Sequence, residues 1–133
     1  MTSKKRILVI DDEPDMTLMV RLNLEKTGRF EVREENNAVN AYQAARDFKP
    51  DVILLDVMMP DMDGGEVLFE LKKDPTLKKV PVIFITATVL QEEVGAKGGT
   101  IAGHPFIPKP FKMSNLLIMI EDALKVATEG PAK

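Results

Sequence analysis

The sequence predicts an α/β protein in which helices cover both faces of a parallel sheet. Short runs of β-branched and other apolar residues alternate with longer segments whose apolar residues recur at helical spacing. Most of the runs are almost continuously apolar, which is typical of strands buried on both faces of a parallel sheet. The chain has 133 residues, 44% of them hydrophobic and 29% charged, which is enough for one domain with its own core.

Five strands are predicted from these runs. The first, third and fourth are apolar throughout, whereas the second alternates apolar and charged residues, like a strand near a sheet edge. The fifth carries Pro105 and Pro108, which have no N–H to donate, and we therefore place it at an edge. The predicted strands cover residues 6–10, 30–34, 51–55, 80–86 and 105–108.

Four helices are predicted from apolar periodicity and from start and stop signals. Pro14 and Gly28 mark the two ends of the first helix, and Asn37 provides an N-cap for the second. The last helix has more apolar residues than a core face needs, at 117–119, so it either exposes a partner surface or is slightly over-hydrophobic. The predicted helices cover residues 14–28, 37–48, 65–74 and 113–127.

Composition excludes several classes of protein. A net charge of −3 gives no basic surplus for sequence-independent binding to nucleic acid, and the absence of cysteine excludes disulfides and thiolate chemistry. No apolar run is long enough for a secretory signal or a membrane span, so the cytoplasm is the expected location. We expect one domain at 1–127, followed at 128–133 by a flexible tail or the start of a linker.

Acids, a hydroxyl and a lysine follow the ends of four predicted strands. In sheets of this kind, ligands bind outside the carboxyl ends of the strands. Each residue alone has an ordinary structural explanation, as a helix cap, a turn residue, the end of a strand or a surface lysine. The residues in question are Asp11, Asp12, Asp56, Thr86 and Lys109.

Taken together, these residues predict a phosphoryl site. Three carboxylates at one end of a sheet repel each other unless a cation neutralises them, and oxygen-only ligands favour a hard cation such as Mg²⁺. A metal and a lysine balance charge on phosphoryl oxygens, and one of the carboxylates can act as the nucleophile.

With these residues in this order, the chain resembles the receiver domains of bacterial response regulators, of which the chemotaxis regulator is the type case. The resemblance covers residues 5–127 and is carried by "ILVIDDEP", "DVILLDVMMPDMDGG", "VIFITAT" and "IPKPF", in this order and spacing. It implies the flavodoxin-like strand order 2-1-3-4-5.

The resemblance also implies roles for individual residues. Asp56 would accept the phosphoryl group. Asp12, Asp56 and the backbone carbonyl of Met58 would bind Mg²⁺, or Mn²⁺ in its place, with Asp11 acting through water. Thr86 and Lys109 would contact the phosphoryl group, and Phe106 would be the switch aromatic. The bond between Lys109 and Pro110 would be cis, and Met58 and Thr88 would tune the lifetime of the phosphorylated state.

The function implied is that of a signalling module, which catalyses only its own phosphorylation and dephosphorylation. A histidine kinase, a phosphotransfer protein or a small phosphodonor would supply the phosphoryl group. The face of the fourth helix, fifth strand and fifth helix would then meet a partner or a second copy of the chain. No direct contact of this domain with nucleic acid or membrane is implied.

Two segments depart from the family pattern. Four glycines occupy 95–103, where the family has a regular fourth helix, so we predict a short or distorted helix there. Gly65 stands where the family has an apolar residue, so we expect a loose start to the third helix.

The sequence argues against three rival functions. A flavin carrier on the same fold would need a hydroxyl- or glycine-rich phosphate loop after the first strand, where "DDEP" would repel phosphate. An aspartate-nucleophile phosphatase would need a second acid two residues after the nucleophile, and that position is Met58. A degenerate receiver acting only as a docking module would lack site residues that this chain has.

Overall fold

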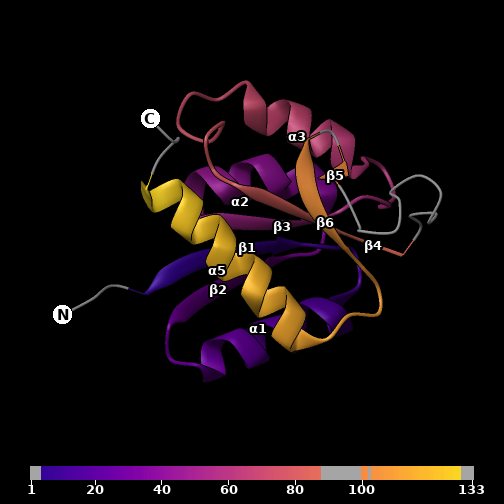
Figure 1. Ribbon diagram of the computed structural model, residues 1–133. Coiled ribbons are helices and arrows are strands. Elements are labelled where there is room, and N and C mark those ends of the chain that lie inside the picture. The colour runs from indigo at the N-terminus through magenta and orange to yellow at the C-terminus, as the bar shows by residue number, and fades with distance from the viewer. Residues whose placement is uncertain (1–3, 88–99, 102, 130–133) are drawn as a thin grey trace.

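The computed structural model describes residues 4–87, 100–101 and 103–129, and it places a six-stranded sheet between two layers of helices (Figure 1). The strands are β1 (Lys5–Ile10), β2 (Phe30–Glu35), β3 (Val52–Asp56), β4 (Val82–Thr86), β5 (Thr100–Ile101) and β6 (His104–Pro108). The helices are α1 (Pro14–Lys26), the 3-10 helix η1 (Ala38–Asn40), α2 (Ala41–Phe48), α3 (Gly64–Lys72) and α5 (Met113–Glu129).

The predicted parallel sheet is confirmed, and the structure adds one strand to it. The order is β2-β1-β3-β4-β6-β5, and β6 is the predicted fifth strand, parallel to β4. The additional strand β5 has two residues and pairs antiparallel with β6. The predicted fifth strand is thus the last strand of the parallel sheet, as expected, and only the antiparallel β5 lies outside it. The strand β5 was not predicted, because two residues are too few to show a periodic pattern.

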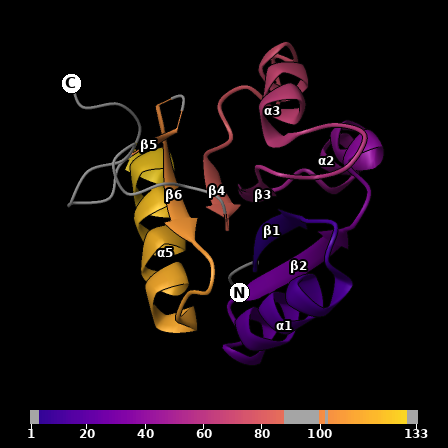
Figure 2. The same ribbon diagram turned by 90° about the vertical axis from the view of Figure 1, so that its right-hand side faces the viewer.

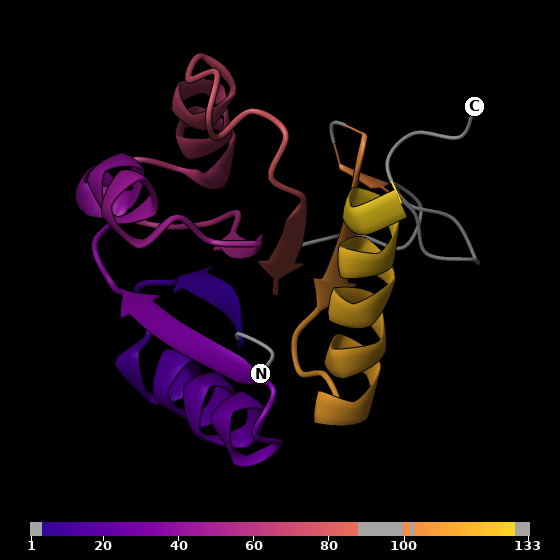
Figure 3. The same ribbon diagram turned by 90° about the vertical axis from the view of Figure 1, so that its left-hand side faces the viewer.

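The two faces of the sheet carry separate apolar cores. Leu8, Ile53, Leu55 and Phe84 point to the face that α2 and α3 cover. Their sequence neighbours point to the other face, which α1 and α5 cover, because successive side chains of a strand alternate. Figure 3 shows these two helix pairs on opposite sides of the sheet. Both faces are therefore buried, as the continuous apolar strands predicted.

The start of α2 differs from the prediction. One helix was predicted over 37–48, but the structure has the 3-10 turn η1 before α2 begins at Ala41. The Asn37 side chain accepts a hydrogen bond from the N–H of Val39, as an N-cap does, and so caps η1 rather than α2. The cap was read correctly, but the short turn that it starts was not.

The start of α3 is firm rather than loose. Asp63 accepts a hydrogen bond from the N–H of Glu66, whose side chain accepts one from the N–H of Asp63. This reciprocal pair is a capping box, and it satisfies two backbone donors that a helix start leaves free. The predicted loose start, which rested on Gly65, is therefore wrong.

Part of the apolar surplus predicted for the last helix is exposed. Ile118 lies exposed on α5, while Leu117 and Met119 pack partly against the core beneath. The segment predicted to hold a short or distorted fourth helix lies outside the described residues, except for Thr100, Ile101 and Gly103. None of the described helices is long and apolar enough to cross a membrane.

Candidate functional site

The predicted site residues follow the carboxyl ends of β1, β3, β4 and β6. Because these strands are parallel, their carboxyl ends all lie at the same end of the sheet. This end faces the viewer in Figure 2. Asp56 ends β3 in register with Ile85 of β4, and Thr86 ends β4. The sheet thereby places side chains from distant parts of the sequence next to one another.

Three carboxylates form a compact cluster at this end of the sheet. Asp11, Asp12 and Asp56 each offer an oxygen, and these oxygens all lie within 4.8 Å of one another. Asp11 is 0% exposed and Asp56 only 4% exposed, while Asp12 is half-buried. Buried carboxylates this close repel each other, and oxygen donors of this kind suit a hard divalent cation.

Lys109 brings a positive charge into the cluster. Its Nζ lies 2.7 Å from Oδ2 of Asp11, 2.8 Å from Oε1 of Glu13 and 3.9 Å from Oδ2 of Asp56. The lysine side chain is 15% exposed. It therefore contacts two carboxylates directly and reaches the third only as a longer ion pair.

The pKa values of these groups follow from burial and from mutual repulsion. Burial, and then the charge of Asp11, raise the pKa of Asp56 from 3.8 to about 6. Burial also raises the pKa of Asp11, although the hydrogen bond with Lys109 opposes that shift. Burial disfavours the Lys109 ammonium, but hydrogen bonds to Asp11 and Glu13 outweigh it and raise the pKa of Lys109 to about 12. The site thus holds a fixed cation beside a carboxylate whose charge is poorly compensated.

The loop after β1 is held by hydrogen bonds from neighbouring segments. The N–H of Glu13 donates to Oδ1 of Asp11 at 2.9 Å. The amide of Asn36 donates to the backbone carbonyl of Asp11 at 2.8 Å and to the hydroxyl of buried Thr17 at 2.9 Å. These contacts fix the backbone that carries Asp11 and Asp12 against α1 and the end of β2.

Gly64 allows a close approach behind Asp56. Its N–H donates to the carbonyl of Val57 at 2.9 Å. A Cβ added at Gly64 would lie 2.5 Å from the carbonyl oxygen of Asp56 and 2.9 Å from Cα of Val57. Only glycine fits there, so the first residue of α3 packs directly on the backbone that carries Asp56.

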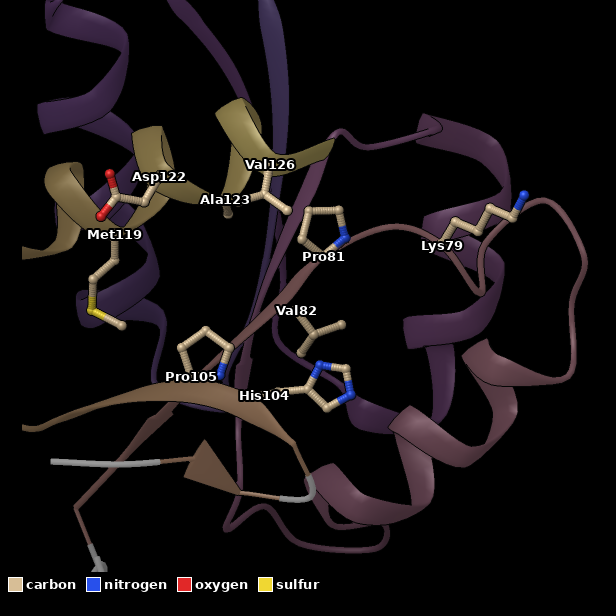
Figure 4. A pocket seen from close by; sticks show the side chains of 9 residues that line it. All are labelled: Lys79, Pro81, Val82, His104, Pro105, Met119, Asp122, Ala123 and Val126. Atoms are coloured by element: carbon tan, nitrogen blue, oxygen red, sulfur yellow. The ribbon is translucent and has the colours of Figure 1, made fainter. Parts of the chain in front are cut away.

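A second hollow lies away from these acids. It has a volume of about 370 Å³ and opens between the start of β4, the start of β6 and the last turns of α5. Figure 4 shows Pro81, Val82, Pro105 and Val126 lining it, with Asp122 and His104 among the polar side chains. It holds one carboxylate among its described lining residues and therefore lacks the acidic cluster.

Comparison with known proteins agrees with this geometry. Residues 7–121 match the family described as "Response regulator receiver domain". The chain belongs to this family. Receiver domains of response regulators accept a phosphoryl group in two-component signalling, and they are signalling domains rather than turnover enzymes.

Individual relatives support the same family. The receiver domain is 33% identical over 129 residues to the phosphate regulon transcriptional regulatory protein PhoB of Pseudomonas aeruginosa, covering 97% of this chain and 56% of that one. It is 36% identical over 120 residues to the probable transcriptional regulatory protein TcrX of Mycobacterium tuberculosis, covering 90% and 49%. The chain thus spans about half the length of these relatives.

A solved structure shows the same fold. The crystal structure of a response regulator from Desulfuromonas acetoxidans superposes with a TM-score of 0.79 at 26% identity, covering 92% of this chain and 98% of that one. The strand order 2-1-3-4-5 of the receiver domain is that of the flavodoxin-like fold.

The receiver domain brings most of the predicted site residues together. Asp11, Asp12, Asp56 and Lys109 form one cluster. Thr86 is buried at the end of β4, and its carbonyl accepts a hydrogen bond from the N–H of Lys109 at 2.9 Å. The peptide bond between Lys109 and Pro110 is cis.

The remaining predicted residues are placed less directly. The N–H of Met58 lies 3.4 Å from Oδ1 of Asp56, and Met58 itself is 58% exposed. Phe106 is buried in β6 and packs in the core beside α2 and α3. Thr88 lies outside the described residues.

Three further residues shape the receiver site and were not predicted. Glu13 follows the first predicted strand, but nothing in the sequence indicates that its side chain contacts Lys109. Asn36 lies between the predicted second strand and second helix, where no motif marks it as a site residue. Gly64 directly precedes the predicted third helix, and its lack of a Cβ permits the close backbone approach that the structure shows.

Proposed function

We propose that Asp56 is the residue on which this receiver domain accepts the phosphoryl group. The observation that carries the proposal is the position of Asp56: buried at the end of a central strand, beside two other acids and within ion-pair distance of Lys109. Asp12 is half-buried, and Asp11 is already engaged by Lys109 and by the N–H of Glu13. Asp56 is therefore the acid with the least compensated charge and the best-placed nucleophile.

The transfer step exchanges one bond to phosphorus for another. An oxygen of the Asp56 carboxylate forms a bond to phosphorus as the P–N bond of a phosphohistidine breaks. The bonding electron pair leaves with the imidazole nitrogen of the partner. Lys109 stabilises the negative charge on the phosphoryl oxygens during the transfer.

Asp12 and Asp56 would hold Mg²⁺, or Mn²⁺, with the backbone carbonyl of Met58 as a further ligand and Asp11 acting through water. The fit rests on the three oxygens that lie within 4.8 Å of one another and on the absence of histidine or cysteine from the cluster. A bound divalent cation supplies charge neutralisation for the phosphoryl oxygens and relieves repulsion among the carboxylates.

Phosphorylation would be read out through Thr86 and Phe106. Thr86 ends β4 next to β6, and Phe106 packs in register with Phe84 on the neighbouring strand. A contact between the phosphoryl group and Thr86 would shift the balance between two arrangements of these side chains. Met58 and Thr88 would set how long the phosphorylated state lasts.

Receiver domains partner with histidine kinases or phosphotransfer proteins. An opening beside Lys109 is lined by Met16, Met19, Pro110 and Phe111, and we propose that the donor histidine enters there. The face of β6 and α5, with exposed Ile118, would meet an output partner or a second copy of the chain. The cytoplasm, where such kinases present their phosphohistidine, is the location that this role requires.

The phosphatase alternative finds no support in the site. Met58, two residues after Asp56, has no proton to give to a leaving group, and its side chain is exposed. The docking-only alternative does not explain why Asp11, Asp12, Asp56 and Lys109 converge.

Intact-mass spectrometry tests the proposal. With Mg²⁺ and a small phosphodonor such as acetyl phosphate, we expect an adduct of ~80 Da, the mass of a phosphoryl group. The adduct should be absent from Asp56→Asn and strongly reduced when a chelator removes the divalent cation. An adduct that persists in Asp56→Asn would overturn the proposal.

A further inference from the structure

Glu13 is a side chain of the site to which the proposed function gives no role. Its Oε1 accepts a hydrogen bond from Nζ of Lys109 at 2.8 Å, although the two residues are 96 positions apart in the sequence. Glu13 occupies the N-cap position of α1, yet its side chain makes no capping hydrogen bond. The carboxylate therefore serves Lys109 rather than the helix.

The ammonium of Lys109 leans toward the loop after β1 and away from Asp56. It lies 2.7 Å from Asp11 and 2.8 Å from Glu13, but 3.9 Å from Asp56. A lysine ammonium has three N–H donors; one of them donates to Glu13, and the same ammonium lies in close ion-pair contact with Asp11. Much of the positive charge that a phosphoryl group would need is thus already neutralised.

The two carboxylates differ in how easily they can release Lys109. The Asp11 side chain is fully buried. If Lys109 moved away, neither the ammonium nor water would be there to stabilise the charge of the Asp11 carboxylate. The Glu13 side chain is 62% exposed, so water can solvate its carboxylate as soon as Lys109 turns away. Glu13 is therefore the partner that gives way when negatively charged phosphoryl oxygens arrive.

We propose that Glu13 restrains phosphoryl transfer by holding Lys109 in a resting ion pair. The proposal rests on phosphorylation of Asp56 and adds a residue that sets its rate. Glu13 acts through Lys109, so it is a positioning residue and does not itself contact the reacting atoms.

The variant Glu13→Gln keeps the size of the side chain and removes its charge. At saturating Mg²⁺, we expect it to form the phosphorylated adduct about two- to five-fold faster than the wild type, the range set by a partly exposed ion pair. Asp15→Asn is the matched control, since it removes an acidic charge from the exposed first turn of α1. Asp15 makes no ion pair with Lys109 in the part of the chain that the structure describes, so this control should keep the wild-type rate.

A double-mutant cycle separates an effect through Lys109 from a general effect of charge. In a Lys109→Met background, where phosphorylation is slow, Glu13→Gln should give no further acceleration. Melting temperatures of all variants establish that each is folded. A rate in Glu13→Gln equal to or below the wild type, an equal gain in Asp15→Asn, or a gain that persists without Lys109 would overturn the inference. Loss of all phosphorylation in the wild type would instead overturn the proposed function.

Discussion

Asp56 lies in surroundings that oppose its own negative charge. It is almost fully buried, and the charge of Asp11 adds repulsion that Lys109 offsets only in part from 3.9 Å. A protein keeps such a carboxylate where another group will neutralise it or where it will react. The same repulsion that destabilises the resting fold favours a bound cation and favours attack on phosphorus.

The stability of the protein should therefore fall as Asp56 ionises. With its pKa raised from 3.8 to about 6, Asp56 keeps its proton in the folded state between these pH values, whereas the unfolded chain has lost it. The free energy of unfolding then decreases as pH rises through this window. Asp56→Asn lacks this decrease, so it should be more stable than the wild type by about 3 kcal/mol at neutral pH.

Urea unfolding in the presence of a chelator checks this prediction. The difference between Asp56→Asn and the wild type should be small at about pH 4 and should grow up to about pH 7. A difference that does not change with pH would show that the ionisation of Asp56 does not oppose folding.

At the level of elements, the turn between β3 and α3 determines how Asp56 is presented. The Asp63–Glu66 capping box fixes the first turn of α3, and Gly64 packs this turn against the carbonyl of Asp56. The helix thus supports the backbone that carries Asp56, the proposed acceptor, and the structure has no space for a side chain between them.

Two adjacent glycines give a matched pair of variants for this contact. Gly64→Ala should lower the free energy of unfolding by roughly 2 kcal/mol or more and slow phosphorylation, because its Cβ would push on the backbone of Asp56 and Val57. Gly65→Ala places its Cβ 3.3 Å from Oδ1 of Asp63 and should leave both quantities close to the wild type. Equal stability and equal phosphorylation rates in the two variants would contradict the close approach at Gly64.

At the level of the whole molecule, the features that could be predicted are those that a local sequence pattern indicates. Continuous apolar runs identified the buried strands, and the acids after those runs were brought together because parallel strands end at the same edge. The pair of Lys109 and Glu13 could not be predicted, because it depends on where two loops meet in space. The strand β5 was missed because its pairing with β6 follows from chain geometry rather than from its two residues.

Locating the phosphoryl group in the chain decides whether Asp56 is the acceptor. The receiver domain is treated with Mg²⁺ and acetyl phosphate, the acyl phosphate is trapped by borohydride reduction, and the peptides are sequenced by mass spectrometry. We expect the reduced aspartate at position 56 alone, and strongly reduced amounts of it when the cation is chelated. Modification at Asp11, at Asp12 or outside the cluster would contradict the assignment of Asp56 as the acceptor.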